Sequence, residues 1–165
     1  MNFFKRYIAM PPQYGLFPYV WLIFLLFPIG YAFPYQTVKQ QAIMGLILIF
    51  LVAYRNGYVA SRYRAFWIIL QMVTSAILAV IIQAFYLNIY TAWVFGSIPM
   101  RRRSFWRYYY AYLLSLIIPA VTLYWYYGGH MGRDDLIGLM VYGLFCIFSP
   151  FAASSIQRFN RKIAN

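Results

Sequence analysis

Long stretches without a charged side chain limit what this chain can fold into. Residues 65–100, for example, include no Asp, Glu, Lys or Arg. An apolar run of about 18 residues or more is typical of a membrane-spanning helix. Charged residues make up only 10% of the 165 residues, whereas a soluble domain carries about 25%. The pattern therefore predicts an all-α fold, a polytopic bundle of helices inside a membrane.

Short polar or charged segments divide the chain into expected helices. Residues 1–15 are expected to be a cytoplasmic or interfacial lead, 16–153 the transmembrane bundle, and 154–165 the start of a cytoplasmic coiled-coil linker. Within residues 65–100, Asn88 is expected to mark a tight turn between two short helices. The other expected spans are 18–35, 41–54 (a short one), 108–126 and 136–153.

The distribution of positive charge decides between six spans and five. Lys and Arg collect on the cytoplasmic side of membrane proteins. With six spans, twelve of the fourteen basic residues share one side, and Lys39 and Arg133 lie on the other. A single span across 65–100 would divide them eight against six. Six spans with both termini in the cytoplasm are favoured over the alternative of five. Four arginines are expected to anchor the cytoplasmic face: Arg101, Arg102, Arg103 and Arg107.

The net charge of +12 follows the same rule, so no nucleic-acid partner is expected. No catalytic residue, metal site or cofactor is expected, and this stretch of chain is not expected to be an enzyme. His130, Asp134 and Asp135 have a weaker interpretation as metal ligands than the aspartates have as residues that favour a helix N-terminus. One polar helix face is expected either to bond neighbouring helices or to line a substrate path: Gln71, Thr74, Ser75 and Gln83.

The C-terminal tail has a spacing of its own. Ala152, Ile156, Phe159 and Ile163 follow one another at intervals of four, three and four, which is the apolar seam of a coiled coil. The alternative is a simple amphipathic helix next to the membrane. The sequence ends without a helix stop signal, so a continuing chain is expected.

Several short motifs suggest a family. They are the stretch from Gly15 to Phe24, Val-Ala-Tyr-Arg at 52–55, Phe-Gly-Ser-Ile at 95–98 and Ser-Pro-Phe at 149–151. In this order they resemble the membrane sensor of DesK-type histidine kinases of the NarL group. The resemblance implies a sensor in the bacterial cytoplasmic membrane that responds to cold through membrane order or thickness. It also implies that the last helix passes the signal to a dimeric coiled coil. Catalytic domains absent from this chain would then act on a response regulator.

Two further functions stay open beside this one. The chain could be a small polytopic transporter or a subunit of a membrane complex, and more remotely a membrane enzyme acting on lipids. On the sensor hypothesis, membrane lipids and a second copy of the chain are the partners. A thicker bilayer would change the tilt of the last helix near Pro150 and so the pairing along Ile156, Phe159 and Ile163.

Overall fold

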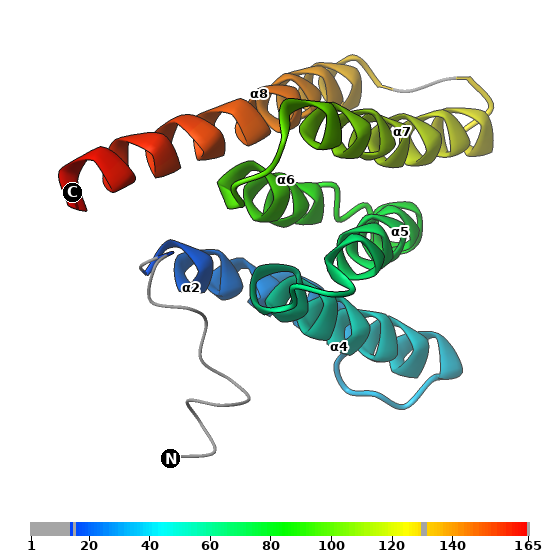
Figure 1. Ribbon diagram of the computed structural model, residues 1–165. Helices are drawn as coiled ribbons and strands as arrows, with labels where there is room; N and C mark the ends of the chain where they lie inside the picture. Colours follow the sequence, from blue (N-terminus) through cyan, green and yellow to red (C-terminus); the bar gives the residue numbers. More distant parts are fainter. Residues whose placement is uncertain (1–13, 15, 130–131, 165) are drawn as a thin grey trace.

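The computed structural model describes residues 14, 16–129 and 132–164, and its regular structure is helical throughout. Of the expected lead 1–15, only Tyr14 is among the described residues. In Figure 1, α7 and α8 lie along one edge of the bundle, α4 lies at the opposite edge, and α6 lies between them. The helical segments are α2 (Phe17–Leu22), η2 (Ile23–Leu25), α3 (Leu26–Ala32), α4 (Val38–Val59), α5 (Arg64–Ile82), α6 (Leu87–Ser97), α7 (Arg102–Tyr126) and α8 (Arg133–Ala164).

The first expected span is one helical region in three pieces. Its 3₁₀ turn, Ile23–Leu25, lies directly ahead of Pro28 in α3. Proline has no amide hydrogen, and its ring crowds the carbonyl four residues earlier. The helix accommodates Pro28 by tightening there. Counted this way, the described chain has six helical regions, as the sequence predicts.

The second helix is longer than predicted. A capping box starts α4, in which the Gln40 amide donates to Thr37 Oγ1 (3.2 Å) and the Thr37 amide donates to Gln40 Oε1 (3.1 Å). The helix then continues for 22 residues to Val59, or about 33 Å. The sequence predicts a short core at 41–54 that Tyr54, Arg55 and Tyr58 can extend by snorkelling. Helix α4 includes all three, but Tyr54 and Tyr58 extend it by packing into the interior.

Residues 65–100 form two helices, as expected, but they do not turn at Asn88. The turn lies at residues 83–86, where Gln83 takes a left-handed conformation with φ 55°. Asn88 lies inside α6 and is fully buried. Its Oδ1 lies 2.9 Å from the Ser75 hydroxyl of α5, and its Nδ2 donates to the Phe85 carbonyl (3.1 Å). A polar side chain paired in this way needs no contact with water.

Three described helices are long and apolar enough to cross a membrane, namely Val38–Val59, Arg64–Ile82 and Arg133–Asn160, and Pro18–Ala32 is a shorter apolar helix. The surface agrees with this finding, because α7 and α8 expose rows of large apolar side chains. A soluble protein seldom exposes so much apolar surface. We therefore describe the bundle as a membrane protein. Examples of the exposed side chains are Leu114, Ile117, Ile118, Met140, Val141, Leu144 and Phe148.

The core surrounds α6, whose eleven residues are all buried. Helices α4, α5, α7 and α8 all pack against it. Aromatic rings fill the space towards α4, with Tyr90 5.5 Å from both Phe50 and Tyr54, edge to face. The Tyr54 hydroxyl donates to the Pro18 carbonyl (2.9 Å), and the Tyr90 hydroxyl donates to the Trp21 carbonyl. Both bonds attach the first helix to the core.

Gln71 provides a test of this packing. Its side chain is fully buried in α5, and neither amide atom has a hydrogen-bond partner among the described residues. An unpaired buried polar group costs about 1–3 kcal/mol. We expect Gln71→Met to raise the free energy of unfolding in detergent micelles by about that amount. The exposed Gln36→Met serves as control and should change little. A loss of stability in Gln71→Met would contradict the packing described.

Candidate functional site

Helices α6 and α8 approach each other closely at Gly96. A Cβ atom on this glycine would stand 2.5 Å from the Pro150 carbonyl oxygen and 2.9 Å from Ala153 Cβ. The nearest of these atoms belongs to backbone, which cannot rotate away. Glycine is therefore the residue that lets the two helices touch at this point.

Pro150 lies at this contact, inside α8. Because proline has no amide hydrogen, the carbonyl of Cys146, four residues earlier, loses its helical donor. The Tyr112 hydroxyl of α7 replaces that donor and lies 3.1 Å from the Cys146 oxygen. Tyr109 donates in the same way to the Ile147 carbonyl at 3.3 Å. Two phenols of α7 thus hold α8 just before its proline.

An aromatic cluster of α7 packs against Phe151, the residue of α8 that follows Pro150. The Phe151 ring lies 5.1 Å from Tyr109, 5.6 Å from Phe105 and 6.1 Å from Trp106, in each case tilted or edge to face. Ring pairs in these arrangements contribute about 0.5–1.5 kcal/mol beyond the area they bury. The segment around Pro150 is thus fixed by α6 on one side and by α7 on the other.

The two faces of α8 differ beyond this contact. Cys146, Ser149, Ala153 and Gln157 are buried towards the bundle. The predicted seam lies on an adjacent face, where Ala152, Ile156 and Phe159 are exposed. Ile163 belongs to α8, but its side chain lies outside the described residues. The C-terminal part of α8 extends past the end of α7 (Figure 1).

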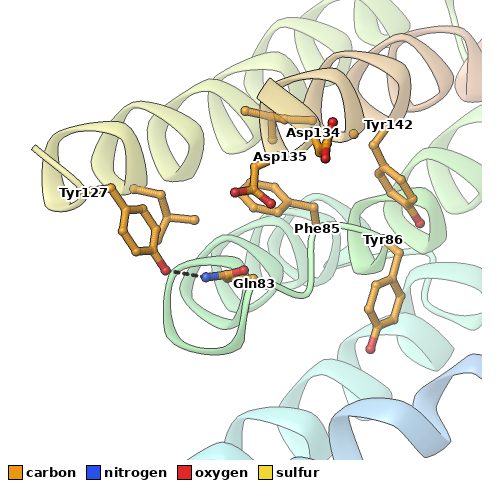
Figure 2. A pocket seen from close by; sticks show the side chains of 10 residues that line it. Gln83, Phe85, Tyr86, Tyr127, Asp134, Asp135 and Tyr142 are labelled. Atoms are coloured by element: carbon orange, nitrogen blue, oxygen red, sulfur yellow. Dashed lines mark hydrogen bonds between the residues drawn. The ribbon is translucent and has the colours of Figure 1, made fainter. Parts of the chain in front are cut away.

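A cavity of about 470 Å³ opens at the other end of α8. Figure 2 shows the carboxylates of Asp134 and Asp135 above the turn that carries Gln83 and Phe85. Gln83 Nε2 donates to the Tyr127 hydroxyl at 2.6 Å and so ties this turn to the end of α7. The two aspartates, which are the only acidic residues of the chain, lie in the first turn of α8, where they favour the helix dipole. Tyr86, Leu123, Gly138, Leu139 and Tyr142 complete the lining.

The predicted polar face divides in the structure. Gln71, Thr74 and Ser75 are buried in the packed centre of α5. The Thr74 hydroxyl bonds to backbone carbonyls of its own helix (2.9 Å to Leu70). Gln83 does not continue this face, because its left-handed backbone ends the helix and its side chain is exposed. The expectation of one shared face over all four residues is therefore wrong for Gln83.

The predicted arginine cluster lies at the start of α7. Arg101 is its N-cap, Arg102, Arg103 and Arg107 follow in the first two turns, and all four are exposed. His130, proposed with the aspartates as a metal ligand, lies outside the described residues. Among the residues that the structure describes, no group of three His, Cys, Asp or Glu could hold a metal ion.

Sequence reasoning missed Gly96 and Tyr112. A glycine within an apolar segment often marks a close approach of another backbone, so Gly96 carried a usable signal. Tyr112 did not, because it is one of 18 tyrosines and its role depends on the carbonyl that Pro150 frees on another helix.

Comparison with known proteins places the chain in a family. Residues 3–153 match the family described as DesK N-terminal domain. The chain belongs to this family. It is also 26% identical over 158 residues to the sensor histidine kinase YvfT of Bacillus subtilis (strain 168). That alignment covers 93% of this chain and 42% of the relative, so the chain spans less than half of the relative's length. No solved structure matches.

These matches confirm the resemblance derived from the motifs. The chain is a DesK N-terminal domain. No catalytic domain is evident within the chain, in which the family match covers most of the residues. The described part of this domain brings Pro150, Gly96 and Tyr112 together at one contact.

The glycine contact can be tested by mutation. Gly96→Ala forces a methyl group against the α8 backbone, and overpacking of this kind costs about 1–3 kcal/mol. Gly45→Ala is the matched control, because a Cβ there has nothing within 4 Å and α4 should gain about 0.5–1 kcal/mol. Unfolding in micelles, followed by circular dichroism, measures both. Equal stability of the two variants would contradict the close approach of α6 and α8.

Proposed function

We propose that this chain senses the physical state of the bacterial cytoplasmic membrane, its thickness or order, and transmits it through α8 to a histidine kinase core. One observation carries the proposal. Helix α8 runs unbroken from the acidic turn at Asp134 to an exposed apolar tail, and the rest of the bundle holds it tightly around Pro150. A helix held near its proline can change direction there when its two ends are displaced.

Lipid has direct access to both the first helix and α8. A groove of about 480 Å³ lies between them and is almost entirely apolar. Acyl chains in this groove would contact both helices at once, so their order and length would act on the angle between them. The lining residues are Trp21, Phe24, Phe27, Tyr86, Ile89, Tyr90, Tyr142 and Phe145.

The proposed topology keeps six crossings with both termini in the cytoplasm. Helix α6 has only eleven residues and rises about 16 Å, roughly half the hydrocarbon thickness. The extended backbone at Ile98 and Arg101 supports a longer path, because four residues of such chain add about 13 Å. Non-helical backbone is tolerated at membrane depth where protein surrounds it. Ile98 fits that requirement because it is buried, whereas Pro99 and Arg101 are exposed and would lie towards the membrane surface.

Output would depend on a second copy of the chain. The exposed Ala152, Ile156 and Phe159 have coiled-coil spacing and are placed to pair with the same residues of a partner. Kinase domains beyond this segment would then phosphorylate a response regulator. The alternative transporter function has less support, because Gln71, Thr74 and Ser75 lie in the packed centre of the bundle. No nucleic acid takes part.

Bilayers of graded thickness test the sensor. The chain is fused after Asn165 to the catalytic core of a sensor histidine kinase and reconstituted in lipids of increasing acyl length. Mismatch costs fractions of a kcal/mol per Å, so a few Å should change autophosphorylation about fivefold. Tyr112→Phe should flatten the response because the Cys146 carbonyl loses its donor. Tyr110→Phe, at an exposed position of the same helix, is the control. Output that is independent of thickness would refute the proposal.

Cysteine labelling tests the topology separately. In a Cys146→Ala background, Gln83→Cys places a thiol in the exposed turn between α5 and α6. Six crossings require a membrane-impermeant maleimide to label it from outside the cell and to leave Arg103→Cys unlabelled until the cells are opened. Labelling of both positions from the same side would exclude the six-crossing arrangement.

A further inference from the structure

A second polar cavity lies at the end of the bundle that carries the arginine cluster. It has a volume of about 490 Å³, which is the size of a small-molecule site. Its walls come from the start of α7, from the part of α8 that follows Pro150, and from the end of α6 with the connection to α7. The lining residues are Gly96, Ser97, Ile98, Pro99, Met100, Arg102, Phe105, Trp106, Phe151, Ser154, Ser155, Gln157 and Arg158.

All charged side chains that line this cavity are positive. Arg102 of α7 and Arg158 of α8 both line it, and none of its lining residues is acidic. The two aspartates of the chain lie in the first turn of α8, and Arg158 is 23 residues or about 35 Å further along that helix. Neither aspartate can therefore neutralise the pair. Two guanidinium groups facing one cavity favour an anion, and arginine is well suited to bind phosphate oxygens.

Neutral hydrogen-bond donors accompany the arginines. Ser154 and Ser155 contribute hydroxyl groups, and Gln157 contributes an amide. Gln157 is only 9% exposed and lines the same cavity as the two arginines. An amide can donate hydrogen bonds to an anion bound there.

The remaining walls identify the type of anion. Phe105, Trp106 and Phe151 form an aromatic side to the cavity and pack against one another. Tryptophan is enriched at the depth of lipid headgroups. Basic pockets between membrane helices on the cytoplasmic side bind anionic headgroups. The glycerol and upper acyl carbons of a lipid would pack on the aromatic side.

We propose that this cavity binds the phosphate group of an anionic phospholipid. Arg102 and Arg158 hold the phosphate oxygens, Gln157 and the serines add hydrogen bonds, and Trp106 packs on the apolar part of the lipid. The binding site itself does not depend on the proposed sensor function. If that function holds, a bound headgroup joins the start of α7 to α8 just beyond Pro150, and lipid charge becomes a second input besides thickness.

A lipid titration with matched charge variants tests the site. The delipidated chain in neutral detergent is titrated with phosphatidylglycerol, with phosphatidylcholine and with soluble glycerol phosphate, and bound molecules are counted by native mass spectrometry. Arg102→Gln/Arg158→Gln removes the two cavity charges. Arg103→Gln/Lys162→Gln removes the same charge from neighbouring exposed positions that do not line the cavity. A hydrogen bond to a charged group contributes about 1.5–3 kcal/mol, so the first variant should bind phosphatidylglycerol at least about tenfold more weakly.

The outcomes separate cleanly. A loss confined to the cavity variant, with preference for phosphatidylglycerol over phosphatidylcholine, supports the site. Equally tight binding of soluble glycerol phosphate would keep the anion site and overturn its assignment to a lipid. An equal loss in both double variants, or no preference for the anionic lipid, would overturn the proposal, because general surface charge would then explain the binding. Should circular dichroism show that the double variant does not fold, the single variants Arg102→Gln and Arg158→Gln, both at exposed positions, replace it.

Discussion

The direct contact between the backbones of α6 and α8 at Gly96 is the constraint on which the rest of the bundle depends. All eleven residues of α6 are buried, and this burial requires the surrounding helices to pack on every side of α6. Because position 96 has no side chain, the α8 backbone lies so close that a Cβ there would stand 2.5 Å from the Pro150 carbonyl oxygen. Membrane helices gain no hydrophobic energy from touching one another, so close packing of this kind and hydrogen bonds must stabilise their association.

A proline within this contact would cost free energy if the carbonyl that it frees had no hydrogen-bond donor. Pro150 removes one helical hydrogen bond, and inside a bilayer no water replaces it. The Tyr112 hydroxyl bonds to the freed Cys146 carbonyl, and the α7 ring cluster packs around Phe151. Tyr54 and Tyr90 likewise donate to backbone carbonyls, here of the first helix. Tyrosine hydroxyls thus join neighbouring helices through backbone carbonyls in both places.

Charge and hydropathy alone predicted much of the fold. They gave six helical regions, the division of residues 65–100 into two helices and the continuous last helix, because each depends on local composition. They failed where distant contacts decide. The sequence indicated a turn at Asn88, which instead lies in the core beside Ser75, and it placed Tyr58 at the membrane interface, whereas Tyr58 is buried. Gln83 left the polar face because the chain reverses there. The candidate site divides similarly, since Pro150 was visible in the sequence and Tyr112 was not.

Helix α8 relates these observations to one another, because it lines both cavities described above and carries Pro150 between them. Its first turn carries the acidic residues of one cavity, and its last turns contribute Gln157 and Arg158 to the other. Between them, Pro150 is held from two sides. A rigid helix would transmit any displacement of one end directly to the other. A helix held at its proline instead lets the two halves respond to different neighbours, with lipid along the first half and the α7 arginines beside the second. Under the two proposals above, bilayer thickness and headgroup charge would act on the exposed seam at Ile156 and Phe159 by separate routes.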